Sequence, residues 1–558
     1  MDSSSPDRPA TKGSGATTRD ARRGGWFVIV AGLVLALVLA LRLTAAVMDA
    51  TLSSDVLYSY VFATDVLAGK YPLSGWTLPG APYFFPDIFF HLPMLAALGP
   101  GGESFAAYAA GSGLVLIGLV AAVARWWHGC RPQTAWLAGV LAVNAALALQ
   151  FLPRHGPVVW LLVQPAYHGG ALLVGLALVA FTGRLLRAPA PTRWLWFDMC
   201  ALLVATLCSD ALVLVQFAGP LCTTVWWLER RAGAPTGTLR RLGKLFLAAA
   251  VGAVAVRLGL ALVSWGYFYQ LGFRQVPTPG VLLHATGKFL GEAAAELVPR
   301  AWGWSAGFAA WLVLLAADLW RSAPAADSRA RAWHGLVALS TGGMVAVVVF
   351  TGFWKDWGNV RYLLNLLFLP LAVVAIAVAR RVAVGGWLGG GRAVALTCGL
   401  AGVAVGAALS LDPAGWRFRP TPASRDFEAA VARHSLHRGL AGYWQADLLN
   451  VLGGTARLNT LKPDAHPYFW CNNAFWFFEP PAPDGTLRWP SYDFVLTAEL
   501  DRAAVLARFG APAEIVHEGA WEMFIYDAAG QARIRAALSP EIVEKLGPGR
   551  LRGLRLDP

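Results

Sequence analysis

The chain has 558 residues, of which 56% are apolar and 14% charged, and its mean hydropathy is +0.51. This composition excludes an ordinary soluble domain and is typical of a polytopic α-helical membrane protein. The net charge of +13 would also suit a nucleic-acid-binding protein. The basic residues, however, lie mostly in short segments between apolar runs, which is a signal of membrane topology, so we expect no nucleic-acid partner.

Apolar runs occupy the chain from residue 26 to residue 411. Residues 1–24 are rich in Ser, Thr, Gly and Arg, and we predict a disordered cytoplasmic tail there. The first run is too long for the apolar core of a signal peptide, so it is interpreted as a membrane anchor. By length and apolarity we expect about eleven transmembrane helices. They are 26–48, 104–127, 134–152, 167–186, 195–209, 211–228, 245–267, 301–320, 334–354, 361–380 and 393–411.

This order of helices divides the protein into a membrane domain, residues 25–411, and a soluble domain, residues 412–558. Basic residues are concentrated in the segments that an inside N-terminus would leave in the cytoplasm. We therefore expect a multi-pass protein of the cytoplasmic (inner) membrane, surrounded by membrane lipids, with its C-terminal domain outside, in the periplasm where there is one.

The C-terminal domain has the pattern of an α/β fold. Strand-like runs occur at 491–497, 514–518 and 521–527, beside helix-like runs at 424–436 and 500–509. We expect this domain to support acceptor recognition and to carry no chemistry. Its aromatic residues at 468–478 either pack on the membrane domain, which we favour, or stack on sugar rings.

Residues 49–103, between the first and second spans, form the outer loop around which we expect the site to be built. Asp55 lies a few residues beyond the first span, where a carboxylate points to a water-filled site. One interpretation is that Ser53-Ser54-Asp55 caps a helix at 56–68. The other is that Asp55 is a general base above a membrane cavity. Tyr58 follows it on the same predicted helix.

Three further side chains of the outer face are candidates. Asp87 and His91 are four residues apart and share a face if the segment is helical. They either orient a base or hold a metal, or they form a buried structural pair. His168 lies at the head of a predicted helix, where it is either an interfacial side chain or a ligand.

Basic residues near the outer face are candidates for holding a phosphate. Arg257 lies inside an apolar run, so it faces a cavity or an ion-pair partner such as Asp210. Lys355 and Arg361 precede the tenth span. Arg361 either extends to the interface or binds a phosphate as a planar fork.

The order of these residues resembles the bacterial GT-C glycosyltransferases, the group of the lipid A aminoarabinose transferase and the protein O-mannosyltransferases. In the outer loop the resemblance rests on Asp55, Tyr58, Gly69, Phe85-Pro86-Asp87-Ile88, Gly99 and Glu103. Near the last spans, Arg361-Tyr362-Leu363-Leu364 with Pro370 is similar to a family motif. The chain departs from the pattern at Val56, His168 and Ser209-Asp210, where the family often has acidic or basic residues.

The resemblance implies a GT-C-like membrane domain and an inverting transfer of sugar from a polyprenyl-phosphate-linked donor to a lipid, glycan or protein acceptor. Asp55 would be the catalytic base, and Asp55 with His168 would be the ligands if a divalent cation, Mg²⁺ or Mn²⁺, is used. The substrate-binding residues would be Tyr58, Asp87, His91, His168, Arg257, Lys355, Arg361 and Tyr362. The alternative is a transporter or flippase of a lipid-linked saccharide that performs no chemistry.

Overall fold

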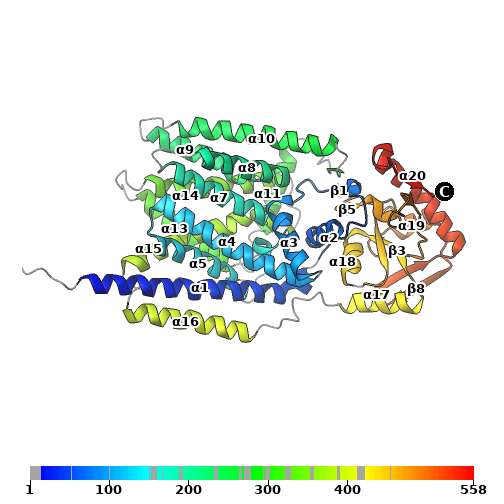
Figure 1. The fold of residues 1–558 in the computed structure, drawn as a ribbon, viewed down its shortest axis with the longest axis horizontal. Helices are drawn as coiled ribbons and strands as arrows, with labels where there is room; N and C mark the ends of the chain where they lie inside the picture. The colour runs from blue at the N-terminus through cyan, green and yellow to red at the C-terminus, as the bar shows by residue number, and fades with distance from the viewer. Residues whose placement is uncertain are drawn as a thin grey trace, which may run out of the picture.

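The computed structural model describes residues 14–557 apart from 52, 100, 150, 152–159, 166–167, 188–192, 232–236, 263–266, 269–277, 293–294, 296–301, 321–327, 352–356, 386–389, 411–420 and 453. A bundle of long helices forms one part of the molecule, and a smaller α/β part lies at one end of it (Figure 1). The segment that follows the first helix lies between the two parts.

Seven helices in the described part of the chain are long and apolar enough to cross a membrane, as expected of a multi-pass membrane protein. They belong to α1 (Ser14–Thr51), α4 (Gly102–His128), α5 (Pro132–Leu149), α10 (Thr238–Leu262), α14 (Ser328–Phe350), α15 (Leu364–Val384) and α16 (Gly390–Leu409). Helix α1 begins inside the tail for which we predict disorder, so residues 14–23 extend this helix ahead of the span, which begins at Gly24. Residues 1–13 lie outside the described residues.

The other segments predicted to span are also helical, but their described apolar stretches are too short to count as candidate spans. They form α7 (Gly169–Leu185), α8 (Arg193–Ser209), the turn η3 (Leu214–Ala218) with α9 (Gly219–Arg231), and α13 (Trp302–Trp320). Two more helices are α6 (Trp160–Val163) and α11 (Pro279–Glu292). Charges at helix ends, such as Glu229-Arg230-Arg231, shorten the apolar stretch, and a span needs roughly 20 apolar residues.

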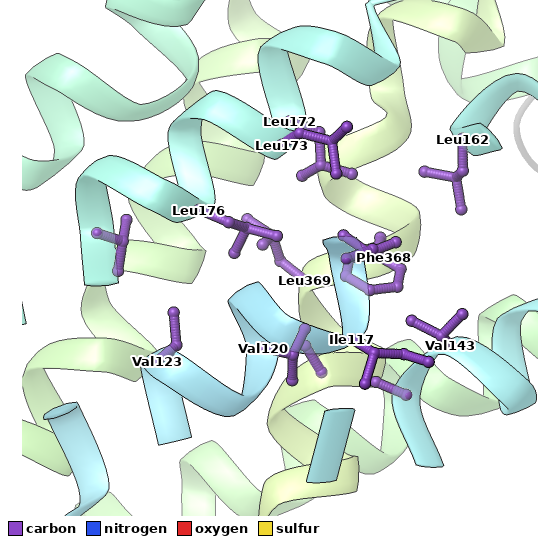
Figure 2. Close-up of a cluster of buried hydrophobic side chains, with 14 of the residues drawn as sticks. Ile117, Val120, Val123, Val143, Leu162, Leu172, Leu173, Leu176, Phe368 and Leu369 are labelled. Carbon is purple, nitrogen blue, oxygen red and sulfur yellow. The ribbon is translucent and has the colours of Figure 1, made fainter. Parts of the chain in front are cut away.

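Aliphatic side chains fill the centre of the helix bundle. Figure 2 shows Ile117, Val120 and Val123 of α4 facing Leu172, Leu173 and Leu176 of α7, with Phe368 and Leu369 of α15 between them. These residues belong to one continuous buried cluster that extends through α1, α5 and α8. Since lipid is as apolar as these side chains, close packing rather than the hydrophobic effect holds the helices together.

The outer loop forms its own compact structure. It contains α2 (Ser54–Ala68), η1 (Leu73–Gly75), β1 (Trp76–Leu78), η2 (Phe84–Ile88) and α3 (Phe89–Leu98). Ser53 caps α2 by accepting a hydrogen bond from the Val56 amide, and α2 ends at Gly69, whose φ of 60° favours glycine. Strand β1 pairs with β2 (Tyr267–Phe268) and with β5 (Asn472–Asn473), so this loop shares a small sheet with the C-terminal part.

The C-terminal part is the predicted α/β fold. Its five-stranded sheet has the order β4-β3-β7-β9-β8, parallel on the β4 side and antiparallel at β9 and β8. The strands are β3 (Arg438–Gly442), β4 (Arg457–Leu461), β7 (Phe494–Leu496), β8 (Glu514–Glu518) and β9 (Trp521–Ile525). The helices are α17 (Pro422–Arg433), α18 (Tyr443–Leu452), α19 (Arg502–Phe509) and α20 (Ala528–Arg550). A short pair of strands, β6 (Thr486–Leu487) and β10 (Arg555–Leu556), lies apart from this sheet, and η8 (Ala474–Phe477) follows β5.

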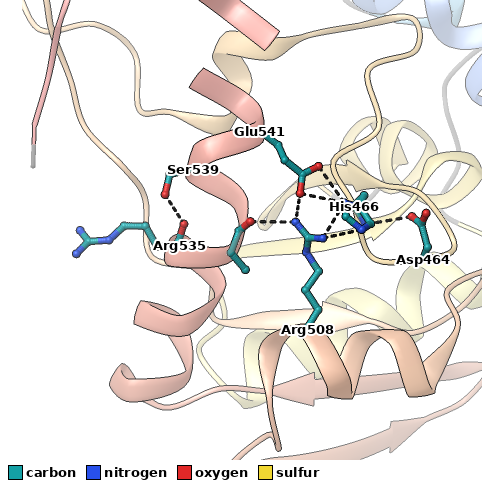
Figure 3. A network of polar contacts seen from close by, with 7 residues as sticks. Asp464, His466, Arg508, Arg535, Ser539 and Glu541 are labelled. Atoms are coloured by element: carbon teal, nitrogen blue, oxygen red, sulfur yellow. Dashed lines mark hydrogen bonds and ion pairs between the residues drawn. The ribbon is translucent and has the colours of Figure 1, made fainter. Parts of the chain in front are cut away.

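A polar cluster joins α19, α20 and the loop after β4 (Figure 3). Arg508 forms an ion pair with Glu541, and the ring of His466 lies against both, with Nδ1 2.9 Å from the Glu541 carboxylate. Although burial raises the pKa of Glu541, the hydrogen bonds from His466 and Arg508 outweigh it and hold the pKa below its usual value. This cluster therefore fixes α20 to α19 and to the loop after β4.

The outer loop and the C-terminal part share one aromatic core. Phe62 and Trp76 of the loop lie in the same buried cluster as Phe475, Trp476 and Phe477. Packing is therefore the role of most of the aromatic residues at 468–478, as we expected, because the four rings at 475–478 are buried.

A buried carboxylate joins the same two parts. Asp65 of α2 accepts hydrogen bonds from the indole nitrogens of Trp76 and Trp476, at 2.7 and 3.3 Å, and from the Asn473 amide at 3.0 Å. Its side chain therefore holds the outer loop to the C-terminal part.

Candidate functional site

Asp55 lies in the first turn of α2, at the junction of the bundle and the C-terminal part. Its neighbour Ser53 is the helix cap, so the Asp55 carboxylate is free to take partners from elsewhere in the fold. A negative charge in the first turn also suits the positive end of the helix dipole. About a quarter of the side chain is exposed, which leaves room for a reacting molecule.

Arg361 is the partner of Asp55 from the membrane domain. It lies in η6 (Trp357–Leu363), the turn that leads into α15. Its Nη1 donates to Asp55 Oδ2 at 3.3 Å, across 306 residues of sequence. The guanidinium has five N–H donors, so it can hold Asp55 and still bind an anion.

Tyr443 is the partner of Asp55 from the C-terminal part, and the sequence analysis did not identify it. Its hydroxyl donates to Asp55 Oδ1 at 2.9 Å, and the Ser54 hydroxyl donates to the Tyr443 carbonyl at 2.6 Å. Burial, reinforced by neighbouring acidic groups, raises the pKa of Tyr443, so the phenol keeps the proton that it donates. The C-terminal part thus contributes directly to the candidate site.

A second set of side chains continues from Arg361. The guanidinium lies over the ring of Tyr362, and this ring packs on His168 with their centroids 4.9 Å apart. His168 Nδ1 is 2.5 Å from Asp210, and its Nε2 is 3.2 Å from the Tyr83 hydroxyl. Burial raises the pKa of Tyr83, so this phenol stays protonated within hydrogen-bond distance of the ring. Asp55, Arg361, Tyr362 and His168 therefore form one continuous group.

Three predicted substrate-binding residues are buried in the fold instead. Tyr58 is 1% exposed, packs among aromatic rings and donates to the Pro82 carbonyl at 3.2 Å. Asp87 accepts a 2.5 Å hydrogen bond from Tyr108 of α4. His91 is fully buried, with Nε2 3.0 Å from the Ser104 hydroxyl. Asp87 and His91 do not pair with each other, because each is bound to α4; they anchor η2 and α3 to that helix.

Arg257 is not part of the group around Asp55. Arg257 donates to the carbonyls of Leu207 and Cys208, at 3.4 and 3.1 Å, and so satisfies the C-terminal end of α8. Asp210, which we considered as its partner, contacts His168 Nδ1 instead. Lys355 lies outside the described residues.

The described residues do not fit a bound divalent cation. Among them, no three Asp, Glu, His or Cys side chains are arranged to hold a metal ion. Both ring nitrogens of His168 have partners, Asp210 and Tyr83, so neither is directed at Asp55. The predicted Mg²⁺ or Mn²⁺ ligands Asp55 and His168 are instead connected through Arg361 and Tyr362.

Comparison of the chain with known protein families, curated proteins and solved structures gives no match. The chemistry must therefore be argued from this group of residues. Its members come from the outer loop, the N-terminus of α7, the turn before α15 and the C-terminal part, four regions far apart in sequence. A pattern in the sequence does point to Tyr443: it begins a helix and lies four residues before Asp447, on the same face.

Proposed function

We propose that the protein is an inverting GT-C-type glycosyltransferase, with about eleven spans and its site at the outer face of the cytoplasmic membrane. The donor would be a polyprenyl-phosphate-linked sugar and the acceptor a hydroxyl of a lipid, glycan or protein. The observation that carries the proposal is the contact of Asp55 with Arg361 and Tyr443. In this contact a partly exposed base lies beside a cation that can bind phosphate, between the helix bundle and the C-terminal part.

Each group has a task in the reaction. Asp55 removes the proton from the acceptor hydroxyl, and the oxygen attacks the anomeric carbon of the donor sugar. The bond from that carbon to the phosphate oxygen breaks, and polyprenyl phosphate leaves with the electron pair. Arg361 stabilises the charge that develops on the phosphate. Attack from the face opposite the leaving group inverts the configuration.

The proposal is tested by turnover in a membrane assay with a polyprenyl-linked sugar donor, followed by mass spectrometry of the lipids and glycans. A glycosylated product that depends on the intact chain supports the enzyme. Movement of the lipid-linked saccharide between leaflets without any new glycosidic bond would support the transporter instead.

Arg361→Ala is expected to raise the apparent donor KM by about tenfold or more, because a hydrogen bond to a charged group contributes roughly 1.5–3 kcal/mol. Arg361→Lys keeps the charge but loses the planar fork, so we expect it to recover only part of the affinity. The measurement is initial rate against donor concentration. An unchanged donor KM in both variants would remove Arg361 from the donor site.

Tyr443→Phe is expected to lower the transfer rate by about tenfold while the thermal midpoint changes little. The phenyl ring keeps the packing, and the lost hydrogen bond costs only about 0.5–1.5 kcal/mol of stability. Without the hydroxyl, Asp55 Oδ1 is no longer held in position. If Tyr443→Phe lowers the thermal midpoint but leaves the transfer rate unchanged, the role of Tyr443 is structural only.

A further inference from the structure

A cavity of about 420 Å³ lies beside the candidate site, between the outer loop and the C-terminal part. Tyr60, Asp65 and Lys70 line it from the loop side, and Asp447, Asn450 and Arg457 line it from α18 and the start of β4. Asp55 and Arg361 are not among the lining residues. The volume is within the usual range of small-molecule sites.

Asp447 is a buried acid that lacks a partner for part of its carboxyl. It is 2% exposed, and its Oδ2 has no hydrogen-bond partner among the residues that the structure describes. Burial, and secondly the charge of Asp55, raises the pKa of Asp447 to about 7. Leaving such an oxygen unpaired is costly, and a hydroxyl of a bound molecule would satisfy it.

Arg457 is a largely buried cation on the same cavity. Its Nη1 donates to the Tyr71 hydroxyl at 2.9 Å, and its guanidinium lies 4.9 Å from the ring centroid of Tyr71 and 5.8 Å from that of Trp476. Within the described part of the chain, no carboxylate is within ion-pair distance of Arg457. A buried cation without a paired carboxylate attracts an anion.

Two further charged side chains line the cavity, Asp65 and Lys70. Asp65 is already held by three donors, Trp76, Trp476 and Asn473. Lys70 is exposed and adds a positive charge where the cavity meets solvent. The cavity is therefore lined by two cations, Arg457 and Lys70, and by two carboxyls, of which Asp65 already has three donors.

We propose that this cavity binds a small hydroxylated anion, with its carboxylate or phosphate at Arg457 and Lys70 and a hydroxyl at Asp447. Acidic sugars and glycerol-phosphate lipid headgroups both have this chemistry. The site is separate from the group around Asp55, and the proposal does not rest on glycosyl transfer. Helix α18 connects the two, because Tyr443 contacts Asp55 and Asp447 lies one turn further on the same face.

The test is calorimetric titration of the purified full chain in phosphatidylcholine nanodiscs. Glucuronate, glycerol 1-phosphate and glucose are titrated separately, and stability is also compared in nanodiscs with phosphatidylglycerol. We expect binding of an anionic probe, with at least tenfold weaker binding of glucose. If phosphatidylglycerol raises the thermal midpoint and the soluble probes raise it much less, the ligand of the cavity is a lipid headgroup.

Variants decide whether the binding belongs to this cavity. Arg457→Gln and Asp447→Ala should each weaken binding of the anionic probe at least tenfold. Lys70 is exposed, so Lys70→Gln cannot disturb the core, and it should weaken binding about threefold. The matched control Arg433→Gln changes an exposed arginine of α17 and should bind as wild type. Asp55→Asn should also bind as wild type, so loss of transfer there leaves this proposal intact. Equal binding of glucose, no binding of any probe, or binding unaffected at Arg457, Asp447 and Lys70 would overturn it.

Discussion

Asp55→Asn is expected to lower the rate of sugar transfer by about 10²–10⁴-fold while the protein stays folded, because an amide cannot accept the proton of the acceptor hydroxyl. The substitution has little structural cost. Ser53, not Asp55, caps α2. The amide oxygen still accepts from Tyr443, and the lost ion pair with partly exposed Arg361 is worth about 0.2–1 kcal/mol.

The control for this prediction is Asp557→Asn, which makes the same chemical change at a carboxylate that is 54% exposed and far along the chain from the site. Rates with a polyprenyl-linked donor and thermal midpoints are measured for both variants in the same membranes. A folded Asp55→Asn protein that transfers sugar at the wild-type rate would contradict the mechanism, and the transporter hypothesis would then be preferred.

Asp65→Ala is expected to cause the largest loss of stability, about 3 kcal/mol or more. It leaves the indole nitrogens of Trp76 and Trp476 and the amide of Asn473 buried without an acceptor, at about 1–3 kcal/mol for each unsatisfied group. Two of these donors, Trp476 and Asn473, join the outer loop to the C-terminal part. We therefore also expect Tyr443 to lose its contact with Asp55 and transfer to fall.

Thermal unfolding of the purified protein, followed by tryptophan fluorescence, measures this effect. Asp65→Asn retains one carbonyl oxygen and should lose less stability than the alanine variant. Asp557→Ala serves as the exposed control. If Asp65→Ala unfolds at the wild-type midpoint, the three hydrogen bonds do not hold the two parts together.

The sequence determined the elements whose signals are local. Apolar runs predicted the helices of the bundle because a membrane helix must satisfy its own backbone and present apolar side chains to lipid. The alternation of apolar residues predicted β7, β8 and β9. The number of spans was not determined by the sequence, because α8 and α9 form helices that are shorter than a span.

The tertiary structure alone decided which side chains meet. Asp55 and Arg361 were predicted as members of one site, but Tyr443 was not, since its contact with Asp55 joins residues 388 apart. Asp87 and His91 are spaced as a functional pair would be, yet each forms a hydrogen bond with a different side chain of α4. Spacing along one helix says which residues share a face. What that face meets depends on how α2, α4, α15 and α18 pack, and packing is set by contacts between segments distant in the chain.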